Sequence, residues 1–448
     1  MNTNTKIVSF CVAALVSLCG IIFHKILGHE FLTAWDDAWQ VMNVGTELWT
    51  WENIRFIFTE YYYGQYSPVN QLLYTILYRL VGYDPFWFHF LSLVLHTGNT
   101  LLVFFILRRL LLMNLGVQKM MKASVISFAV AALFAVHPLQ VEVVAWVSAS
   151  KVLVYSFFYL LAVVCYIGYI QKKSVRRRII LYISMLLFFA LSFGGKEQAI
   201  VLPVCLLLVD LICRRDFRTT QIWVEKIPVF VLSLLFAVVT LESHATHNVG
   251  LLSEEQFYPF LHRIVFACYA FCEYIVKIII PVNLFYIYPF PMLVGEPLPL
   301  RFWIYPVFLL MIGLGLWKYW KQRPVWLGML WFLIHIALML HIVPLSRINI
   351  IADRYVYLAL PGIFFIIVWY LVVIWEKRPK MRIILTICGL IWFLFLNFQS
   401  YQRTQVWHDN KSLKTKLHHL LQQREDYQKE TPEEETIENK EEDEHEIQ

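Results

Sequence analysis

Residues 7–27, with the sequence IVSFCVAALVSLCGIIFHKIL, decide the fold class of this chain. They form an apolar run of about the length that crosses a hydrocarbon core of roughly 30 Å as a helix. Similar runs recur at 88–111, 123–137, 152–170, 179–193, 197–213, 227–241, 263–280, 302–317, 326–344, 355–375 and 382–398. Hydrophobic residues make up 59% of the chain and charged residues only 16%, against about 25% charged in an ordinary soluble domain. The sequence therefore predicts an all-α polytopic membrane protein.

Strongly basic connections between these runs indicate how the chain is oriented. They are Arg108-Arg109 with Lys119 and Lys122, Lys172-Lys173 with Arg176-Arg177-Arg178, Arg214-Arg215 with Arg218, Lys318 with Lys321 and Arg323, and Lys377-Arg378 with Lys380 and Arg382. Because Lys and Arg concentrate in cytoplasmic loops, all of these connections should face the cytoplasm. If successive apolar runs cross the membrane in alternating directions, the basic connections all fall on one side only when segment 263–280 enters and returns, or lies in the interface. We therefore expect a bundle of about eleven transmembrane helices, with the amino terminus inside and the carboxyl tail outside.

The segment 28–87 is different in kind from the apolar runs. It is polar and rich in Trp and Tyr, including Tyr61-Tyr62-Tyr63. Such a composition predicts a sizeable first external loop with short amphipathic helices in the membrane interface. We assign residues 1–400 to one transmembrane domain that includes this loop. Residues 401–448 are expected to be a charged, disordered, non-cytoplasmic tail, because they become rich in Glu, Lys and Gln.

Two adjacent carboxylates, Asp36 and Asp37, lie in this external loop. Other polar residues expected on the same non-cytoplasmic side are His137, Glu142, Lys151, Lys196, Glu197, Arg347, Asp353 and Arg354. Charges near a span are costly unless they pair or serve a water-filled cavity, so acids and bases that meet on one face indicate a functional site. The cations of such a face can hold a phosphate, and an acid can accept a proton. The alternative is that these charges neutralise one another in salt bridges at the helix ends.

Composition argues against several other kinds of site. The eight cysteines are scattered through or beside apolar runs, which favours small core residues over a disulfide framework or a zinc site. Adjacent carboxylates can bind a divalent cation, but neighbours in sequence rarely both point at one ion, so we predict no metal and no cofactor. The net charge of +6 reflects membrane orientation rather than binding to nucleic acid.

The segment His137–Ser148, HPLQVEVVAWVS, resembles the HPxxxExVAW motif of the transmembrane and tetratricopeptide-repeat O-mannosyltransferases and their bacterial relatives. That family belongs to the GT-C class of polyprenyl-phosphate-sugar-dependent glycosyltransferases. Other stretches resemble further family elements in the same order: Asp36-Asp37, Tyr66-Ser67-Pro68, Phe88-His89 through Leu95-His96, Gly195-Lys196-Glu197, Asp353–Leu358, and Trp407 with Leu413. The resemblance covers about residues 30–415. The chain departs from the family pattern at Ala149–Val152, where an aspartate is lost, and after Leu420, where a charged stretch replaces the repeats.

The resemblance implies a GT-C-like fold and inverting transfer of a sugar, mannose in the named family, from a polyprenyl-phosphate donor to a hydroxyl. We expect the acceptor to be a protein Ser or Thr, a glycan or a lipid. The missing repeats and the short tail favour a bacterial cytoplasmic membrane, and the basic connections place the active site on its outer side. Asp36, or else Asp37, is the candidate base. Lys196 and Arg354, followed by Lys151 and Arg347, are the candidates that bind the donor phosphate. His137, Glu142 and Glu197 are expected to orient the sugar or the acceptor. For His137 and Glu142 the alternative is that they hold the loop that carries the acids.

Two other classes of function remain open at this point. A transporter or flippase of an anionic lipid-linked substrate would also need cations near the membrane, although paired repeats and broken helices are not clear in this sequence. A non-catalytic membrane scaffold could retain the fold and lose the activity, and the missing aspartate near Lys151 is a change of that kind.

Overall fold

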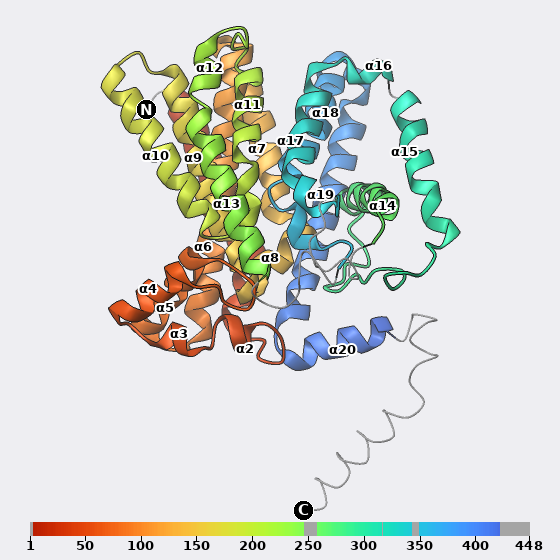
Figure 1. Ribbon diagram of the computed structural model, residues 1–448. Coiled ribbons are helices and arrows are strands. Elements are labelled where there is room, and N and C mark those ends of the chain that lie inside the picture. Colours follow the sequence, from red (N-terminus) through yellow and green to blue (C-terminus); the bar gives the residue numbers. More distant parts are fainter. Residues whose placement is uncertain (1–2, 246–257, 316, 343–348, 422–448) are drawn as a thin grey trace, which may run out of the picture.

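The computed structural model describes residues 3–245, 258–315, 317–342 and 349–421, and helices dominate these ranges (Figure 1). The principal helices are α1 (Thr3–Phe23), α6 (Pro85–Leu115), α7 (Met120–Val136), α9 (Ser150–Gln171), α10 (Val175–Phe193), α11 (Leu202–Ile212), α13 (Ile227–Ala245), α14 (Phe260–Ile279), α15 (Ile304–Gly315), α17 (Arg323–Ile336), α18 (Leu360–Lys377) and α19 (Arg382–Thr404). Each predicted apolar run overlaps one of these helices. The prediction of an all-α membrane protein is confirmed.

Within the described ranges, seven helical segments are long and apolar enough to cross a membrane: Asn4–Gly28, Pro85–Leu115, Val117–Val136, Val147–Gln171, Thr220–Ser243, Leu360–Lys377 and Pro379–Trp407. Two shorter apolar segments are Leu300–Gly315 and Arg323–Met339. Figure 1 shows α14 end-on, whereas α17, α18 and α19 are seen from the side, so α14 runs across the bundle. A helix that runs across the bundle is expected if segment 263–280 does not cross the membrane. The total of about eleven spans stays a prediction.

Small side chains let the central helix pack closely against its neighbours. Every residue of α7 from Val130 to Val136 is buried, and this stretch contains three alanines in the order Ala131, Ala132 and Ala135. The helices α1, α6 and α18 pack against α7. Small residues at helix contacts allow close backbone approach, which favours association inside a membrane where no hydrophobic effect acts between helices.

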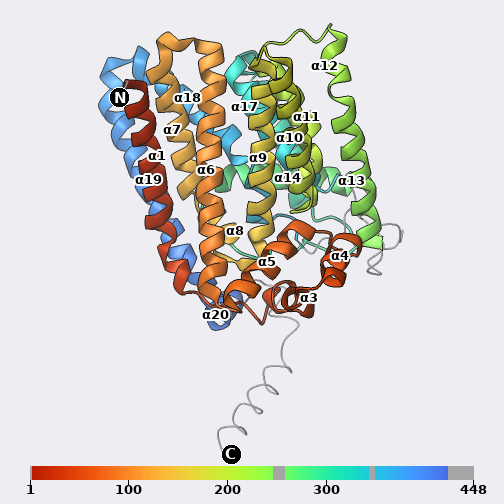
Figure 2. The same ribbon diagram turned by 90° about the vertical axis from the view of Figure 1, so that its left-hand side faces the viewer.

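The external segment folds into short helices, α2 (Asp37–Gln40), α3 (Val44–Glu47), α4 (Trp51–Thr59) and α5 (Pro68–Val81). They lie together at one end of the bundle, next to α8 (Val141–Ala145) (Figures 1 and 2). Local signals set the boundaries of this segment. The α5 helix begins at Pro68 and stops at Gly82, whose φ of +66° suits glycine, and Asp84 caps α6 through the Phe86 amide.

The prediction of a disordered tail from residue 401 is wrong for residues 401–421. Here α19 runs to Thr404, and α20 (Asn410–Leu421) follows after a 3₁₀ turn. Trp407 and Leu413 are buried in the core, and the Asn410 side chain bonds the Ala34 amide and the Thr33 hydroxyl. These contacts tie the segment to the external loop, which composition alone does not reveal. Residues 422–448 lie outside the described part.

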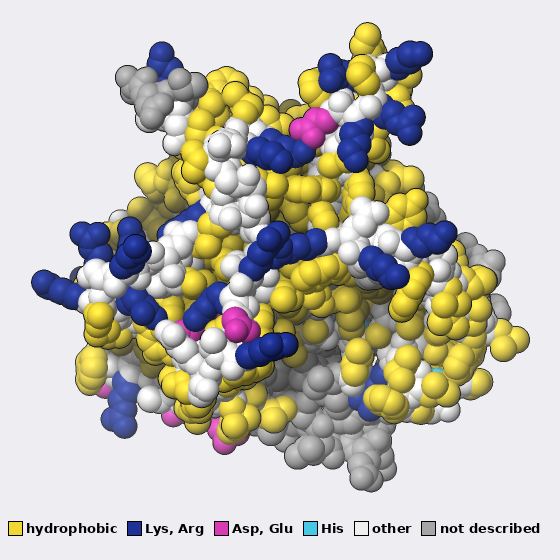
Figure 3. Space-filling model, turned by 90° about the horizontal axis from the view of Figure 1, so that it is seen from above, with side chains coloured by type: hydrophobic (Ala, Val, Ile, Leu, Met, Phe, Trp, Pro, Cys, Tyr) yellow, Lys and Arg dark blue, Asp and Glu magenta, His cyan; other side chains and the backbone are white. Residues whose placement is uncertain are grey.

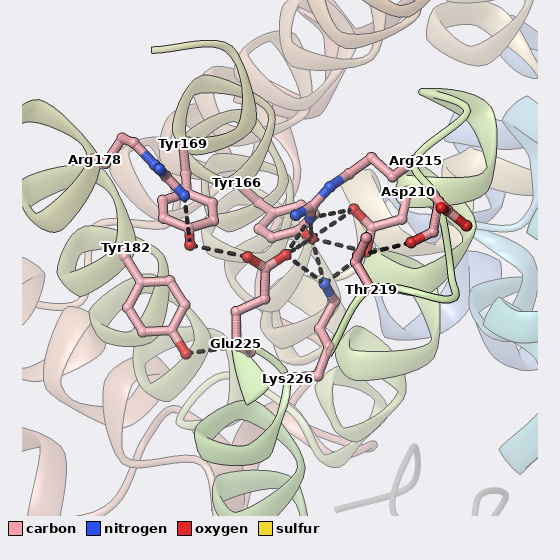
Figure 4. A network of polar contacts seen from close by, with 10 residues as sticks. Tyr166, Tyr169, Arg178, Tyr182, Asp210, Arg215, Thr219, Glu225 and Lys226 are labelled. Carbon is pink, nitrogen blue, oxygen red and sulfur yellow. Dashed lines mark hydrogen bonds and ion pairs between the residues drawn. The ribbon is translucent and has the colours of Figure 1, made fainter. Parts of the chain in front are cut away.

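Basic side chains gather at the opposite end of the bundle. Figure 3 shows Lys and Arg spread over this face, with few Asp and Glu among them. The loops beside α12 (Thr220–Val224) and α16 (Trp317–Trp320) belong to it (Figures 1 and 2). Beneath it, Asp210 and Glu225 pair with Arg215 and Lys226 around the hydroxyl of Tyr166 (Figure 4). The acids and bases of this buried network balance, so it joins α9, α11 and the start of α13 without a net charge.

Candidate active site

A polar cavity of about 180 Å³ lies at the end of the bundle that carries the external segment. Its charged lining residues are Asp36, Lys151, Lys196, Glu197 and Arg354, and Gln65, Tyr66, Trp146, Thr240 and Ser243 complete most of the wall. Asp36 precedes α2, Lys151 lies in the first turn of α9, and Arg354 lies in the 3₁₀ turn Asp353–Val356. The structure thus brings together five of the residues singled out in the sequence.

The carboxylate of Asp36 is half-buried and is held by two neutral donors. Its Oδ1 accepts a hydrogen bond of 3.3 Å from the Trp39 indole, and its Oδ2 accepts one of 3.3 Å from the Gln40 amide. Both donors come from the following turn, α2, so the local helix aims the carboxylate. A carboxylate held by neutral groups in a cavity is able to accept a proton from a bound hydroxyl.

Amide side chains hold Lys151 in the cavity. Its Nζ donates to Gln40 Oε1 at 3.1 Å and to Gln65 Oε1 at 2.7 Å. Gln40 therefore bridges Asp36 and Lys151, an acid and a base from distant parts of the chain. Sequence reasoning missed both glutamines, because an amide in a polar loop carries no distinguishing signal. The two amides therefore fix the position of Lys151 Nζ in the cavity.

Lys196 reaches the cavity from the turn between α10 and the 3₁₀ helix Glu197–Val201. The residue is 7% exposed, and its Nζ lies 4.0 Å from Glu197 Oε1. Two glycines before it allow the turn to lie against the bundle. A Cβ atom on Gly194 would stand 2.5 Å from Val69 Cγ2, and one on Gly195 would stand 2.7 Å from the backbone nitrogen of Tyr155.

We expect Gly195→Ala to lower the free energy of unfolding by about 1–3 kcal/mol, because the added methyl overlaps backbone that cannot move alone. Thermal unfolding of the purified protein measures the effect. Gly28→Ala is the control, since nothing lies within 4 Å of a Cβ at that position. Equal midpoints for the two variants would contradict the close packing of this turn.

Arg354 is fixed by a buried partner. Its guanidinium pairs with Glu142 Oε1, and its backbone amide donates to Glu142 Oε2 at 3.2 Å. The rings of Trp146 and Tyr355 lie 5.6 and 5.3 Å from the guanidinium carbon. Burial alone would lower the pKa of Arg354, but the carboxylate of Glu142, with Tyr355 and Asp36, raises it above its usual range. Arg354 therefore stays charged, with part of its side chain exposed to the cavity.

The structure separates the two adjacent aspartates. Asp37 does not line the cavity; it is buried, and its carboxylate accepts bonds from the Leu32 amide at 2.8 Å, the Ser148 amide at 3.0 Å and the Ser148 hydroxyl. It ties the external segment to the 3₁₀ turn Val147–Ala149. Because α2 begins at Asp37, the two side chains leave the backbone in different directions. Asp36 therefore faces the cavity, whereas Asp37 holds the loop.

Burial raises the pKa of Asp37 to about 6, although its hydrogen bonds favour the ionised form. Since the ordinary pKa of an Asp side chain is about 3.8, the folded protein binds this proton more tightly than the unfolded chain. The contribution of Asp37 to stability is therefore present below a pH of about 4 and is lost as the pH rises through about 6. Relative to Asp37→Asn, the parent should lose up to about 3 kcal/mol over that rise. Thermal unfolding of both proteins across this range tests it, and a constant difference would contradict it.

Two of the residues expected to orient the sugar have other roles. His137 does not line the cavity; it is buried with both ring nitrogens in use, because Nε2 bonds the Ile278 carbonyl at 3.0 Å and Nδ1 accepts from the Leu139 amide at 3.2 Å. Glu142 is also fully buried and holds Arg354 instead of facing the cavity. Glu197 does line the cavity. Arg347 lies outside the described residues.

The alternative of salt bridges at the helix ends holds for part of the set: Glu142 pairs with Arg354, and Lys196 Nζ lies 4.0 Å from Glu197 Oε1. Asp353 pairs with Arg403, a residue that the sequence did not single out, and accepts a bond of 3.1 Å from the Tyr288 hydroxyl. It lies outside the cavity lining. Among the described residues, no three His, Cys, Asp or Glu side chains gather in a way that could hold a metal ion. The cavity itself holds three cations against two carboxylates, which suits an anionic group.

Comparison with known proteins gives partial matches to a single group of proteins. The protein O-mannosyl-transferase TMTC1 of Homo sapiens is 27% identical over 165 residues, which is 34% of this chain and 17% of that protein. The protein O-mannosyl-transferase F38B6.6 of Caenorhabditis elegans is 24% identical over 218 residues, 46% of this chain and 28% of that protein. TMTC1 of Mus musculus is 27% identical over 169 residues, covering 34% and 16%.

The chain therefore spans less than a third of the length of these curated relatives. No protein-family model matches the chain. The similarity nonetheless agrees with the resemblance drawn from the motif around His137 to Ser148 and from the ordered elements on either side of it. On this evidence, the chain is similar to the protein O-mannosyl-transferases.

Proposed function

We propose that this protein is a membrane glycosyltransferase that moves mannose from a polyprenyl-phosphate donor to a hydroxyl group, with protein Ser or Thr as the acceptor. The observation that carries the proposal is the cavity in which Asp36 meets Lys151, Lys196 and Arg354. A carboxylate that can accept a proton, beside basic side chains that can bind a phosphate, is an arrangement that supports transfer from a lipid phosphate. The names of the similar proteins support the class of reaction.

In the proposed reaction the acceptor oxygen attacks the anomeric carbon of the donor from the face opposite the phosphate, so the configuration inverts. The new carbon–oxygen bond forms as the bond to the phosphate oxygen breaks. The hydroxyl proton passes to Asp36, whose carboxylate raises the nucleophilicity of the attacking oxygen. Polyprenyl phosphate leaves with the bonding electrons. No metal is required, because the charge that grows on the phosphate faces fixed cations.

Those cations act on the leaving group. Lys196 and Arg354, with Lys151 behind them, are proposed to bind the phosphate oxygens. Two of them are held before the reaction begins, Arg354 by Glu142 and Lys151 by two amides. Preorganised charges aimed at developing negative charge lower the barrier without further reorganisation. Glu197 is left as the candidate that orients the sugar hydroxyls.

Purified protein incubated with radiolabelled polyprenyl-phosphate mannose and a Ser/Thr-rich peptide tests the proposal. Label transferred to the peptide supports it. Label crossing a vesicle membrane without transfer would indicate a transporter or flippase, and an inert donor would indicate a non-catalytic scaffold. Repeating the assay with a glycan and a lipid acceptor distinguishes the acceptor classes.

The proposal also requires the cavity to face away from the cytoplasm, with the basic end inside. In a cysteine-free background, Glu52→Cys on the exposed side of α4 should react with a membrane-impermeant thiol reagent in intact cells. Lys172→Cys, in the connection between α9 and α10, should react only after lysis. The reverse pattern would contradict the orientation.

A further inference from the structure

A second cavity lies between helices of the bundle, toward the end that carries the basic connections. It has a volume of about 280 Å³ and is walled by α6, α17 and α18, with Leu107, Leu111, Phe365 and Trp369 among its apolar residues. It shares no lining residue with the polar cavity described above. We refer to it as the lateral groove. The only charged side chains among the described residues that line it are Arg214 and Arg323.

The dimensions of the lateral groove match one leaflet of a bilayer. Its wall on α6 extends from Val103 to Leu115, and at 1.5 Å per residue this corresponds to about 18 Å. Half of the hydrocarbon core is about 15 Å thick. The two arginines lie at the ends of α11 and α17 that face the basic side. An apolar slot as long as one leaflet, ending in cations at the headgroup level, matches the shape of a single phospholipid chain and its phosphate.

Arg323 is fixed at the mouth of the lateral groove. Its Nη2 donates hydrogen bonds of 3.0 Å to the carbonyl oxygens of Leu211 and Ile212, the last residues of α11. A guanidinium carries five N–H donors, so these two bonds leave others to point toward an anion. The nearby acids Asp210 and Glu225 are already paired with Arg215 and Lys226. They therefore do not cancel the charge of Arg323.

Arg214 occupies a position where its backbone would favour glycine. Its φ is +56°, and its amide donates to the Leu211 carbonyl in the turn that ends α11. Glycine usually fills such a left-handed position after a helix, because a Cβ atom is strained there. The side chain is exposed, so no packing contact accounts for an arginine. The strained arginine at the end of the lateral groove therefore indicates that its positive charge has a function there.

From these observations we propose that the lateral groove binds an anionic glycerophospholipid of the leaflet at the basic end. One acyl chain lies along α6, and the phosphate contacts Arg214 and Arg323. Basic pockets between transmembrane helices on the cytoplasmic side select anionic headgroups in this way. The bound lipid is not the sugar donor, whose phosphate belongs at the opposite end of the bundle in the proposed function. It fills the space between α6 and the α17–α18 pair and stabilises their packing.

The test compares lipid retention by native mass spectrometry after purification in equal amounts of phosphatidylglycerol and phosphatidylcholine. The parent should retain phosphatidylglycerol preferentially. Arg214→Gly should reduce that preference about fivefold. The same change relieves the backbone strain, so the folded protein should be no less stable in lipid-free detergent. Arg214→Lys should keep the preference, and Arg218→Gln, an exposed basic residue outside the groove, is the control for charge.

A second variant tests the apolar part of the site. Leu107→Trp fills the lateral groove and should reduce retention of the lipid, whereas Leu101→Trp, on α6 but outside the lining, should not. Equal retention of the two phospholipids, or unchanged preference in both Arg214→Gly and Leu107→Trp, would overturn the proposal. Displacement of phosphatidylglycerol by polyprenyl phosphate would also overturn it, because the lateral groove would then be the seat of the donor chain.

Discussion

Asp36→Asn is expected to reduce sugar transfer by roughly 10²- to 10⁴-fold, the range typical of a lost general base. An amide has almost the same shape as the carboxylate, and its single oxygen can still accept a bond from Trp39 or Gln40, but it cannot accept the hydroxyl proton. Binding of the donor should change little, because the phosphate contacts Lys196 and Arg354 in the proposed complex. The measurement is the rate of label transfer with donor binding followed separately.

Two control variants make this result specific. Glu52→Gln changes an exposed acid on α4, outside the cavity, to its amide, and it should leave transfer unchanged. Asp37→Asn changes the neighbouring acid, which holds the loop, and it should alter stability more than the rate of the folded protein. A parental rate in Asp36→Asn, together with a large loss in Asp37→Asn, would assign the base to the other aspartate.

Arg354→Gln should have the largest combined effect on stability and rate. It leaves Glu142 as an unpaired carboxylate that is fully buried, a change that costs about 3–5 kcal/mol. It also removes a cation from the leaving phosphate, for which a loss of about 10²–10³ in rate is typical. Unfolding and transfer are measured on the same preparations, because the two losses have separate causes.

The double variant Glu142→Gln with Arg354→Gln separates those causes. With both charges removed, no ion is left unpaired, so the free energy of unfolding should recover by about 1–3 kcal/mol relative to the single variant. Transfer should remain as slow as in Arg354→Gln. Recovery of activity together with stability would show that Arg354 acts only in folding.

Lys122→Gln, which breaks the exposed pair with Glu376, should cost no more than about 1 kcal/mol.

If the results expected for Asp36→Asn and Arg354→Gln are obtained, Asp36 and the basic side chains of the cavity act together in sugar transfer. Neither a transporter nor a non-catalytic scaffold would account for these losses of transfer. Glu142 is then a positioning residue, since its contacts reach the cavity only through Arg354. This also explains why the HPxxxExVAW motif contains functionally unlike residues. In this chain His137 ties the turn to α14, Glu142 holds Arg354, and Trp146 lines the cavity beside it.

Several candidates were recognisable from the sequence because charge next to an apolar run is rare and costly. Asp36, Lys151, Lys196 and Arg354 stood out on this ground, and the cavity contains all four. Gln40 and Gln65 did not stand out, since neutral amides are common in loops. The partner of Asp353 was missed for a related reason: Arg403 lies near the end of an apolar run, where a cation is ordinarily assigned to the headgroups.

The sequence by itself determined the environment of this protein, since its apolar runs have the length and composition that only a bilayer accommodates. A membrane span is a continuous stretch of apolar residues, so each run can be recognised directly from the order of residues along the chain. Which acid pairs with which base, by contrast, depends on the tertiary structure. Asp36 and Asp37 are neighbours, yet one lines the cavity and the other is buried in the loop's anchor. Pairs such as Glu142 with Arg354 join positions more than 200 residues apart, because only the packing of the helices brings their ends together.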